Sequence, residues 1–191
     1  EVFDFEQLKI GDTGVRYGDW QAGHLIFAEG WRGKFNPYFQ YLPFRGSKGE
    51  VLRIRLPEHH FDRIIKHRLF IVPFVDDTYW VGTYNDNQFK DEEPSAKGHD
   101  YLRERLDEVL AIPYEIVDHQ AAVRPTVKDR RPFLGRHPGH PRLVLFNGLG
   151  TKGASLAPFW ARHLAAHLEN HTPLDPEVDI RRFTPGSVQP V

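Results

Sequence analysis

Residues 147–158 read NGLGTKGASLAP, and the interpretation of the whole chain depends on this stretch. Its three glycines, Gly148, Gly150 and Gly153, have the spacing GxGxxG, and they follow the short strand pattern 142–147 and precede a helical pattern. Glycine has no Cβ atom, so such a loop can adopt positive φ angles and bring backbone N–H groups close to a ligand, while the helix dipole favours negative charge. The stretch therefore predicts a site for an anion or an electron-rich ring. The alternative is a tight strand-to-helix turn without a ligand.

Two common glycine-loop sites do not fit the surrounding sequence. A dinucleotide-binding βαβ unit needs a further strand and an acidic residue about 20 positions beyond the motif. Here Asp175 and Glu177 fall in a proline-containing segment with no strand pattern before it. A P-loop needs Ser or Thr after its lysine, whereas Gly153 follows Lys152.

The composition is that of an ordinary folded chain. Its 191 residues suffice for one core, or for one domain and part of another, and 40% of them are hydrophobic. A net charge of -1 gives no broad attraction to nucleic acid or to an anionic membrane, so we expect a small-molecule partner. No apolar run approaches the roughly 20 residues of a membrane span, and there is no cysteine for a disulfide framework. We expect a cytoplasmic protein, and a homo-oligomer is compatible with this sequence.

The hydrophobic patterns predict an α+β fold. An antiparallel sheet is expected after a boundary near Gly46, with a hairpin turn at Asp76 and Asp77 and a strand that ends where Pro125 removes a hydrogen-bond donor. The aromatic segment 31–48 is interpreted as a crossing between two structural units. The expected strands are 14–20, 24–29 (a buried parallel strand), 49–56, 68–75, 78–84, 114–127 and 142–147, and the expected helices are 99–110 and 155–169.

Several motifs in this order resemble one enzyme family. RPTVKDRRPFLGRHP (124–138), RLVLFNGLG (142–150) and TKGASLAPFWARHLAAHL (151–168) are similar to the carboxyl half of the FAD-dependent D-amino-acid oxidase and glycine oxidase family. The resemblance covers about residues 13–183. It also includes the strand motifs HLIFAEG, RLFIVP and YWVG, the segment SKGEVL (47–52) and the closing VDIRRF (178–183).

The resemblance implies a domain organisation and a cofactor, FAD. Residues 1–46 would be part of an FAD-binding domain, 47–123 an antiparallel substrate-binding domain, 124–183 a return to the FAD domain, and 184–191 a tail. The family's N-terminal GxGxxG segment is absent, and the chain has no methionine. We therefore expect a portion of a longer oxidoreductase that is inactive by itself. The loop residues expected to contact the pyrimidine side of the flavin are Gly148, Leu149, Gly150, Thr151, Lys152 and Gly153.

The resemblance also assigns substrate-binding residues. Arg124 matches the arginine that binds the substrate carboxylate, and a guanidinium binds a carboxylate in a bidentate manner. The alternative is a structural pairing of Arg124 with Asp118 or Asp129. Tyr84 is expected to line the substrate face, with a core or rim position as the alternative.

Two positions depart from the family pattern, and they put the amino-acid substrate in question. Thr151 occupies the place of a second arginine found in glycine oxidase relatives, and Phe70 the place of a tyrosine. Lys152, beside Thr151, is a candidate replacement for the missing positive charge.

No catalytic dyad and no metal site are predicted. In the family the flavin performs the redox step, so no strong protein acid or base is required. His163 and His167 have a two-ligand helical spacing, but HLAAH lacks the glutamate of HExxH and no third ligand is evident. His137 and His140 are expected at the surface. The run 128–131 (KDRR) is interpreted as a solvated turn, with Arg130 or Arg131 as residues that could reach a substrate entrance.

These observations favour part of an FAD-dependent oxidoreductase that acts on an amino acid or a related amine. Two other functions remain open. One is a non-catalytic ligand- or anion-binding module with the same fold, and the other is a structural or interaction domain.

Overall fold

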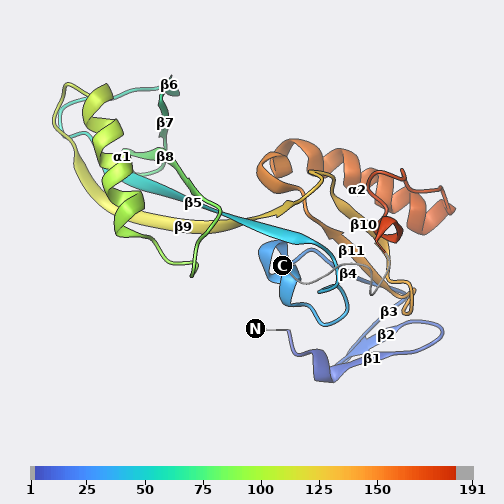
Figure 1. Cartoon of the computed structure of the whole chain (residues 1–191). Helices are drawn as coiled ribbons and strands as arrows, with labels where there is room; N and C mark the ends of the chain where they lie inside the picture. Colours follow the sequence, from blue (N-terminus) through green and yellow to red (C-terminus); the bar gives the residue numbers. More distant parts are fainter. Residues whose placement is uncertain (1–2, 184–191) are drawn as a thin grey trace. The chain divides into compact units, whose positions relative to one another are not determined.

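The computed structural model describes residues 3–183, so the predicted tail at 184–191 lies outside the described residues. The chain forms two compact units (Figure 1). Unit 1 contains Glu1–Gly46 and Pro125–Val191, and unit 2 contains Ser47–Arg124. Mixed helices and mainly antiparallel sheets confirm the predicted α+β class. Within the part of the chain that the structure describes, no helix is both long and apolar enough to cross a bilayer.

Unit 2 is built on a five-stranded sheet with one helix along one face (Figure 1). The strand order is β6 (Ile65–His67), β7 (Leu69–Pro73), β8 (Thr78–Asp86), β5 (Phe44–Arg55) and β9 (Glu115–Val127). The helix is α1 (Ala96–Val109), and Ser95 caps its N-terminus by accepting a hydrogen bond from the Gly98 N–H at 3.0 Å.

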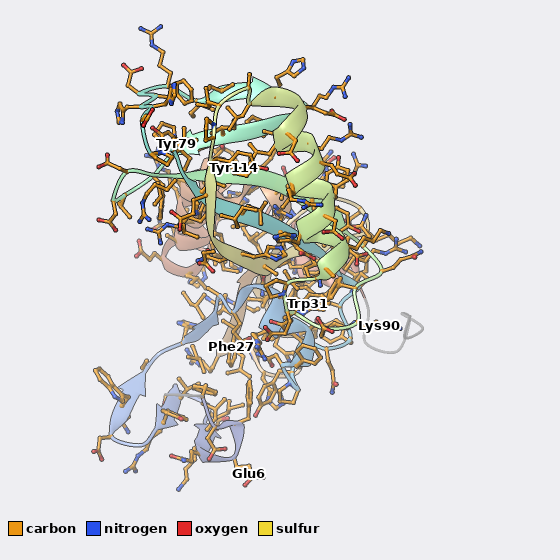
Figure 2. All side chains as sticks on the ribbon, turned by 90° about the vertical axis from the view of Figure 1, so that its left-hand side faces the viewer. Glu6, Phe27, Trp31, Tyr79, Lys90 and Tyr114 are labelled. Carbon is orange, nitrogen blue, oxygen red and sulfur yellow. The ribbon has the colours of Figure 1, made fainter. Side chains whose placement is uncertain are left out.

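Alternation along the strands explains the core of unit 2. Leu52 and Ile54 on β5 are fully buried and belong to the same cluster as Leu102 and Leu106 of α1, because residues two apart on a strand share a face. Tyr79 is buried in the same cluster, and its hydroxyl accepts a hydrogen bond from the Phe61 N–H at 2.9 Å (Figure 2).

Unit 1 contains two three-stranded sheets and the second helix. One sheet is antiparallel, with β1 (Leu8–Ile10), β2 (Val15–Tyr17) and β3 (Trp20–Ala22). The other has the order β10 (Phe133–Arg136), β11 (Leu143–Asn147) and β4 (Leu25–Phe27), with β4 parallel to β11. The helix is α2 (Gly153–Asn170), and short 3-10 helices are η1 (Phe5–Gln7), η2 (Gly30–Phe35), η3 (Gly150–Lys152) and η4 (Ile180–Arg182).

The main core of unit 1 is aromatic. Phe27 (Figure 2) is buried in a cluster with Phe39 and Phe133, and its ring centroid lies 5.8 Å from that of Phe39. Phe133 in turn makes edge-to-face contacts with Phe44 and Phe183, at 5.0 and 5.7 Å between centroids. Such pairs add to the stabilisation from buried area, so segments distant in sequence are held together here.

Several predicted elements have different limits in the structure. The stretch 14–20 contains β2, a turn at Gly18 with φ 55°, and the first residue of β3, so it is no single strand. The parallel pairing of 24–29 is confirmed, but Ile26 is 46% exposed, so the strand is not buried on both faces. The strand at 114–127 does not end at Pro125: β9 continues to Val127, because β9 lies at the sheet edge, where a missing N–H is tolerated.

The predicted hairpin is confirmed. β7 and β8 pair antiparallel around Asp76 and Asp77, whose φ angles are 56° and 50°. Positive φ at both central residues matches the right-handed twist of the strands, and Asp tolerates this conformation better than most residues do.

Candidate functional site

The glycine loop has the backbone conformation that its sequence predicts. Gly148 and Gly150 have φ angles of 73° and 60°, in the left-handed region that favours glycine. Gly153 differs, because it is the first residue of α2 and has ordinary helical angles. The loop between β11 and α2 therefore needs glycine at 148 and 150 for conformational reasons.

Asn147 attaches the loop to η2, a role that the sequence did not reveal. Its side chain is 3% exposed. Its Nδ2 donates to the Gly30 carbonyl at 2.9 Å, and its Oδ1 accepts from the Gly148 N–H at 2.7 Å. A Cβ at Gly33 would lie 2.5 Å from Asn147 Nδ2, so the close packing of the two segments requires glycine there. In the sequence, the only indication of this role is that Asn147 is a polar residue at the end of an apolar strand.

The glycine loop leads through η3 directly into the N-terminus of α2. Neither η3 nor α2 has a side-chain cap, and neither has an acidic residue in its first turn. Thr151 and Lys152 are exposed beside it. The first N–H groups of a helix lack intrahelical partners, and the helix dipole makes this end partly positive. The loop is therefore suited to an electron-rich group.

Arg124 lies across a neighbouring strand of unit 2. Its Nη1 donates to Asn85 Oδ1 at 3.0 Å. The two carboxylates considered as alternatives have other partners: Asp118 accepts from Gln120 Nε2 at 2.6 Å, and Asp129 pairs with Arg182 at 3.1 Å. Among the described residues, no carboxylate lies within ion-pair distance of Arg124. Its partly exposed guanidinium therefore keeps its charge available to a ligand.

The other predicted substrate residues are Tyr84 and Thr151, and Phe70 is the second departure from the family pattern. The ring of Tyr84 contacts that of Tyr101 on α1, at 5.3 Å between centroids. Phe70 is 44% exposed, and its strand register places it opposite Gly82 on β8. Thr151 belongs to unit 1, and Arg124 to unit 2.

The histidines have structural partners. His163 Nε2 accepts from the Asp175 N–H at 2.9 Å, and His167 Nδ1 lies 2.9 Å from the Thr172 carbonyl oxygen, so both hold the segment after α2. The expectation of a surface position for His137 is wrong. It is half-buried, lies 5.4 Å from the Phe39 ring and stacks with His140, and burial lowers its pKa. The described residues contain no group of three His, Cys, Asp or Glu side chains that could hold a metal ion.

The run 128–131 forms a turn held by Arg182. Arg130 is at its tip with φ 59°, and the Arg182 guanidinium donates to the carbonyl oxygens of Arg131 and Pro132 at 3.0 and 3.1 Å. Arg131 pairs with Glu177 at 3.1 Å. The turn is charged and exposed, as predicted, and Arg131 has a structural carboxylate partner.

A family model described as FAD dependent oxidoreductase matches residues 1–167. The chain therefore belongs to the FAD-dependent oxidoreductase family.

Individual relatives agree with this family. The chain is 30% identical to a glycine oxidase of Bacillus subtilis over 149 residues, which cover 74% of this chain and 40% of that protein. It resembles the crystal structure of a glycine oxidase from Geobacillus kaustophilus with a TM-score of 0.69 and 23% identity, over 100% of this chain and 52% of that one. An iminodiacetate oxidase from Chelativorans sp. BNC1 gives a TM-score of 0.67 and 23% identity, over 94% and 52%. The chain thus spans about half the length, or less, of these proteins.

Proposed function

We propose that this chain provides the substrate-binding unit and a flavin-contacting segment of an FAD-dependent oxidoreductase that acts on an amino acid or a related amine. The observation that carries the proposal is the positive-φ glycine loop at an uncapped helix N-terminus, in a chain of this family. When bound, FAD would accept a hydride from the carbon that bears the amine. Residues 148–153 would contact the flavin, where backbone N–H groups stabilise negative charge.

Arg124 would bind the carboxylate of the substrate. Its guanidinium has a neutral hydrogen-bond partner, and a carboxylate could approach its remaining N–H groups in a bidentate manner. Such binding orients the substrate without any proton transfer by the arginine. Arg124→Ala is therefore expected to raise KM for an amino-acid substrate, and an unchanged KM would rule out this role.

The loop assignment can be tested at Lys152, which occupies the N-cap position of α2. Lys152→Asp and Lys152→Asn both place a side-chain oxygen at this position, and the two side chains have nearly the same size. Only the aspartate adds negative charge where the electron-rich flavin edge would lie. We expect Lys152→Asp to weaken FAD retention and Lys152→Asn to weaken it much less.

Flavin retention is the direct measurement. The protein is produced with any coding sequence that lies upstream, and its visible absorption is recorded after gel filtration. Flavin bands that are lost in Lys152→Asp and kept in Lys152→Asn would support the proposal. Equal retention by both variants would contradict contact between the loop and the flavin.

A non-catalytic anion-binding module is the second candidate. The departures at Thr151 and Phe70 keep it open, because the resemblance places an arginine and a tyrosine at these positions in some relatives. A protein that remains colourless when FAD is added would favour this candidate. The cytoplasmic location, the absence of a nucleic-acid partner and a homo-oligomer remain predictions, which fractionation, a nucleic-acid binding assay and analytical ultracentrifugation would test.

A further inference from the structure

We infer that Gly49 and Asn85 are positioning residues that hold the Arg124 guanidinium in place for a carboxylate. This inference rests on the proposed role of Arg124. It concerns three adjacent strands of unit 2, in the order β8, β5, β9. Asn85 is on β8, Gly49 is on β5 and Arg124 is on β9.

The strand register explains the contact. Gly49 and Asn85 are direct cross-strand partners, so their side-chain positions lie on the same face of the sheet. Arg124 on the next strand extends across Gly49, and its Nη1 reaches Asn85 Oδ1 at 3.0 Å. Arg124 can pass over β5 at this point because Gly49 has no side chain.

Space, and not backbone conformation, requires glycine at position 49. A Cβ there would lie 2.1 Å from Arg124 Nη1, 2.3 Å from Nη2 and 2.4 Å from Cζ. Gly49 is not among the residues with positive φ, so alanine could adopt its backbone conformation. An alanine would therefore displace the guanidinium and leave β5 intact, because the end of a long side chain moves more easily than a strand.

Asn85 supplies an acceptor without charge. Its carboxamide oxygen fixes one nitrogen of the guanidinium and leaves the positive charge for the ligand. An aspartate at this position would hold Arg124 as firmly but would neutralise it. A positioning role thus predicts that Asn85→Asp weakens carboxylate binding more than Asn85→Ala does. A purely structural role predicts little effect of Asn85→Asp, because Asn and Asp have nearly the same size.

Positioning can be measured directly by NMR on the labelled 191-residue chain. The order parameter of the Arg124 Nε–H group should fall in Asn85→Ala and in Gly49→Ala. The matched controls are Asn87→Ala, an exposed asparagine two residues away, and Gly23→Ala, where a new Cβ meets no atom within 4 Å. An unchanged order parameter in both test variants would overturn the inference, whatever Arg124 binds.

The functional consequence is measured with acetate as the probe and acetamide as the neutral control, from amide shifts along β5 and β8. We expect a Kd for acetate about fivefold higher in Asn85→Ala, which corresponds to one hydrogen bond, and a larger increase in Asn85→Asp. Circular dichroism should show that both variants remain folded.

The outcomes separate the inference from the proposed function. If Arg124→Ala abolishes acetate binding while Asn85→Ala and Gly49→Ala leave it unchanged, the inference fails and the role of Arg124 stands. If acetate does not bind the unaltered chain, or binds Arg124→Ala equally well, the proposed role of Arg124 fails and the ligand part of the inference fails with it.

Discussion

The two positive-φ glycines of the loop should respond very differently to alanine. At Gly148 the new Cβ would lie 2.7 Å from Val127 Cγ2 and 3.3 Å from the Phe133 nitrogen, both within the packed interior. At Gly150 the nearest atom would be Thr126 Cγ2, at an ordinary contact distance of 3.8 Å. Both variants have the conformational cost of left-handed backbone, about 1 kcal/mol. Gly148→Ala has in addition an overpacking cost of about 2 kcal/mol.

Urea unfolding and hydrogen exchange measure this difference. The free energy of unfolding should fall by about 1 kcal/mol in Gly150→Ala and by about 3 kcal/mol in Gly148→Ala. With slopes of about 2 kcal/mol per M, the two midpoints should differ by about 1 M urea. Hydrogen exchange of the β11 amides reports on unit 1 by itself, which matters because two units need not unfold together. Equal losses in the two variants would refute the packing argument.

Two further predictions concern buried polar groups. Burial raises the pKa of Glu50, but hydrogen bonds from the Ser95 N–H and hydroxyl, together with Lys48, lower it below its ordinary value of 4.5. The folded state then binds the proton of Glu50 less readily than the unfolded state does. The stability that Glu50 contributes should therefore be fully present above about pH 4.5 and decrease as the pH falls further. In an acid titration, Glu50→Gln should show a smaller decrease in the free energy of unfolding. The Tyr41 hydroxyl is buried with no hydrogen-bond partner among the described residues, and burial, then Asp179, raises its pKa to about 12. Tyr41→Phe should therefore leave thermal stability unchanged or increase it by about 1 kcal/mol, and a loss greater than this would indicate a partner for the hydroxyl.

The sequence predicts the elements that depend on local chemistry. The strands at 49–56 and 78–84 alternate or are rich in β-formers over seven or more residues, and two aspartates mark the hairpin between the strands at 68–75 and 78–84. The strands β1, β6 and β10 were missed because they have only three or four residues, too few for a period to be visible. Their pairing with distant segments determines them.

The same distinction, between features that depend on local sequence and features that depend on distant residues, applies to the candidate site. The conformations of Gly148 and Gly150 follow from their own backbone, so the GxGxxG spacing predicts them. The role of Gly49 depends on a side chain from a strand 75 residues away, and no local pattern contains that information. Asn147 and Asn85 are similar cases, since an asparagine shows its hydrogen-bond partners only in the folded chain.

Three consecutive residues of β5, at positions 48–50, lie alternately on the two faces of the sheet. Lys48 and Glu50 are buried on the α1 side, where Glu50 accepts hydrogen bonds from the Ser95 N–H at 2.9 Å and the Ser95 hydroxyl at 2.7 Å, at the start of the helix. Gly49 faces the opposite side, beneath Arg124. The residues on either side of Gly49 thus fix the strand on which the guanidinium rests. Because the two faces are separate, Glu50→Gln should alter acid stability without loosening Arg124, and Gly49→Ala should loosen Arg124 without altering acid stability. If Glu50→Gln and Gly49→Ala each changed both acid stability and the mobility of Arg124, the two faces of the sheet would be energetically coupled. Neither Glu50 nor Gly49 could then be assigned to a single role.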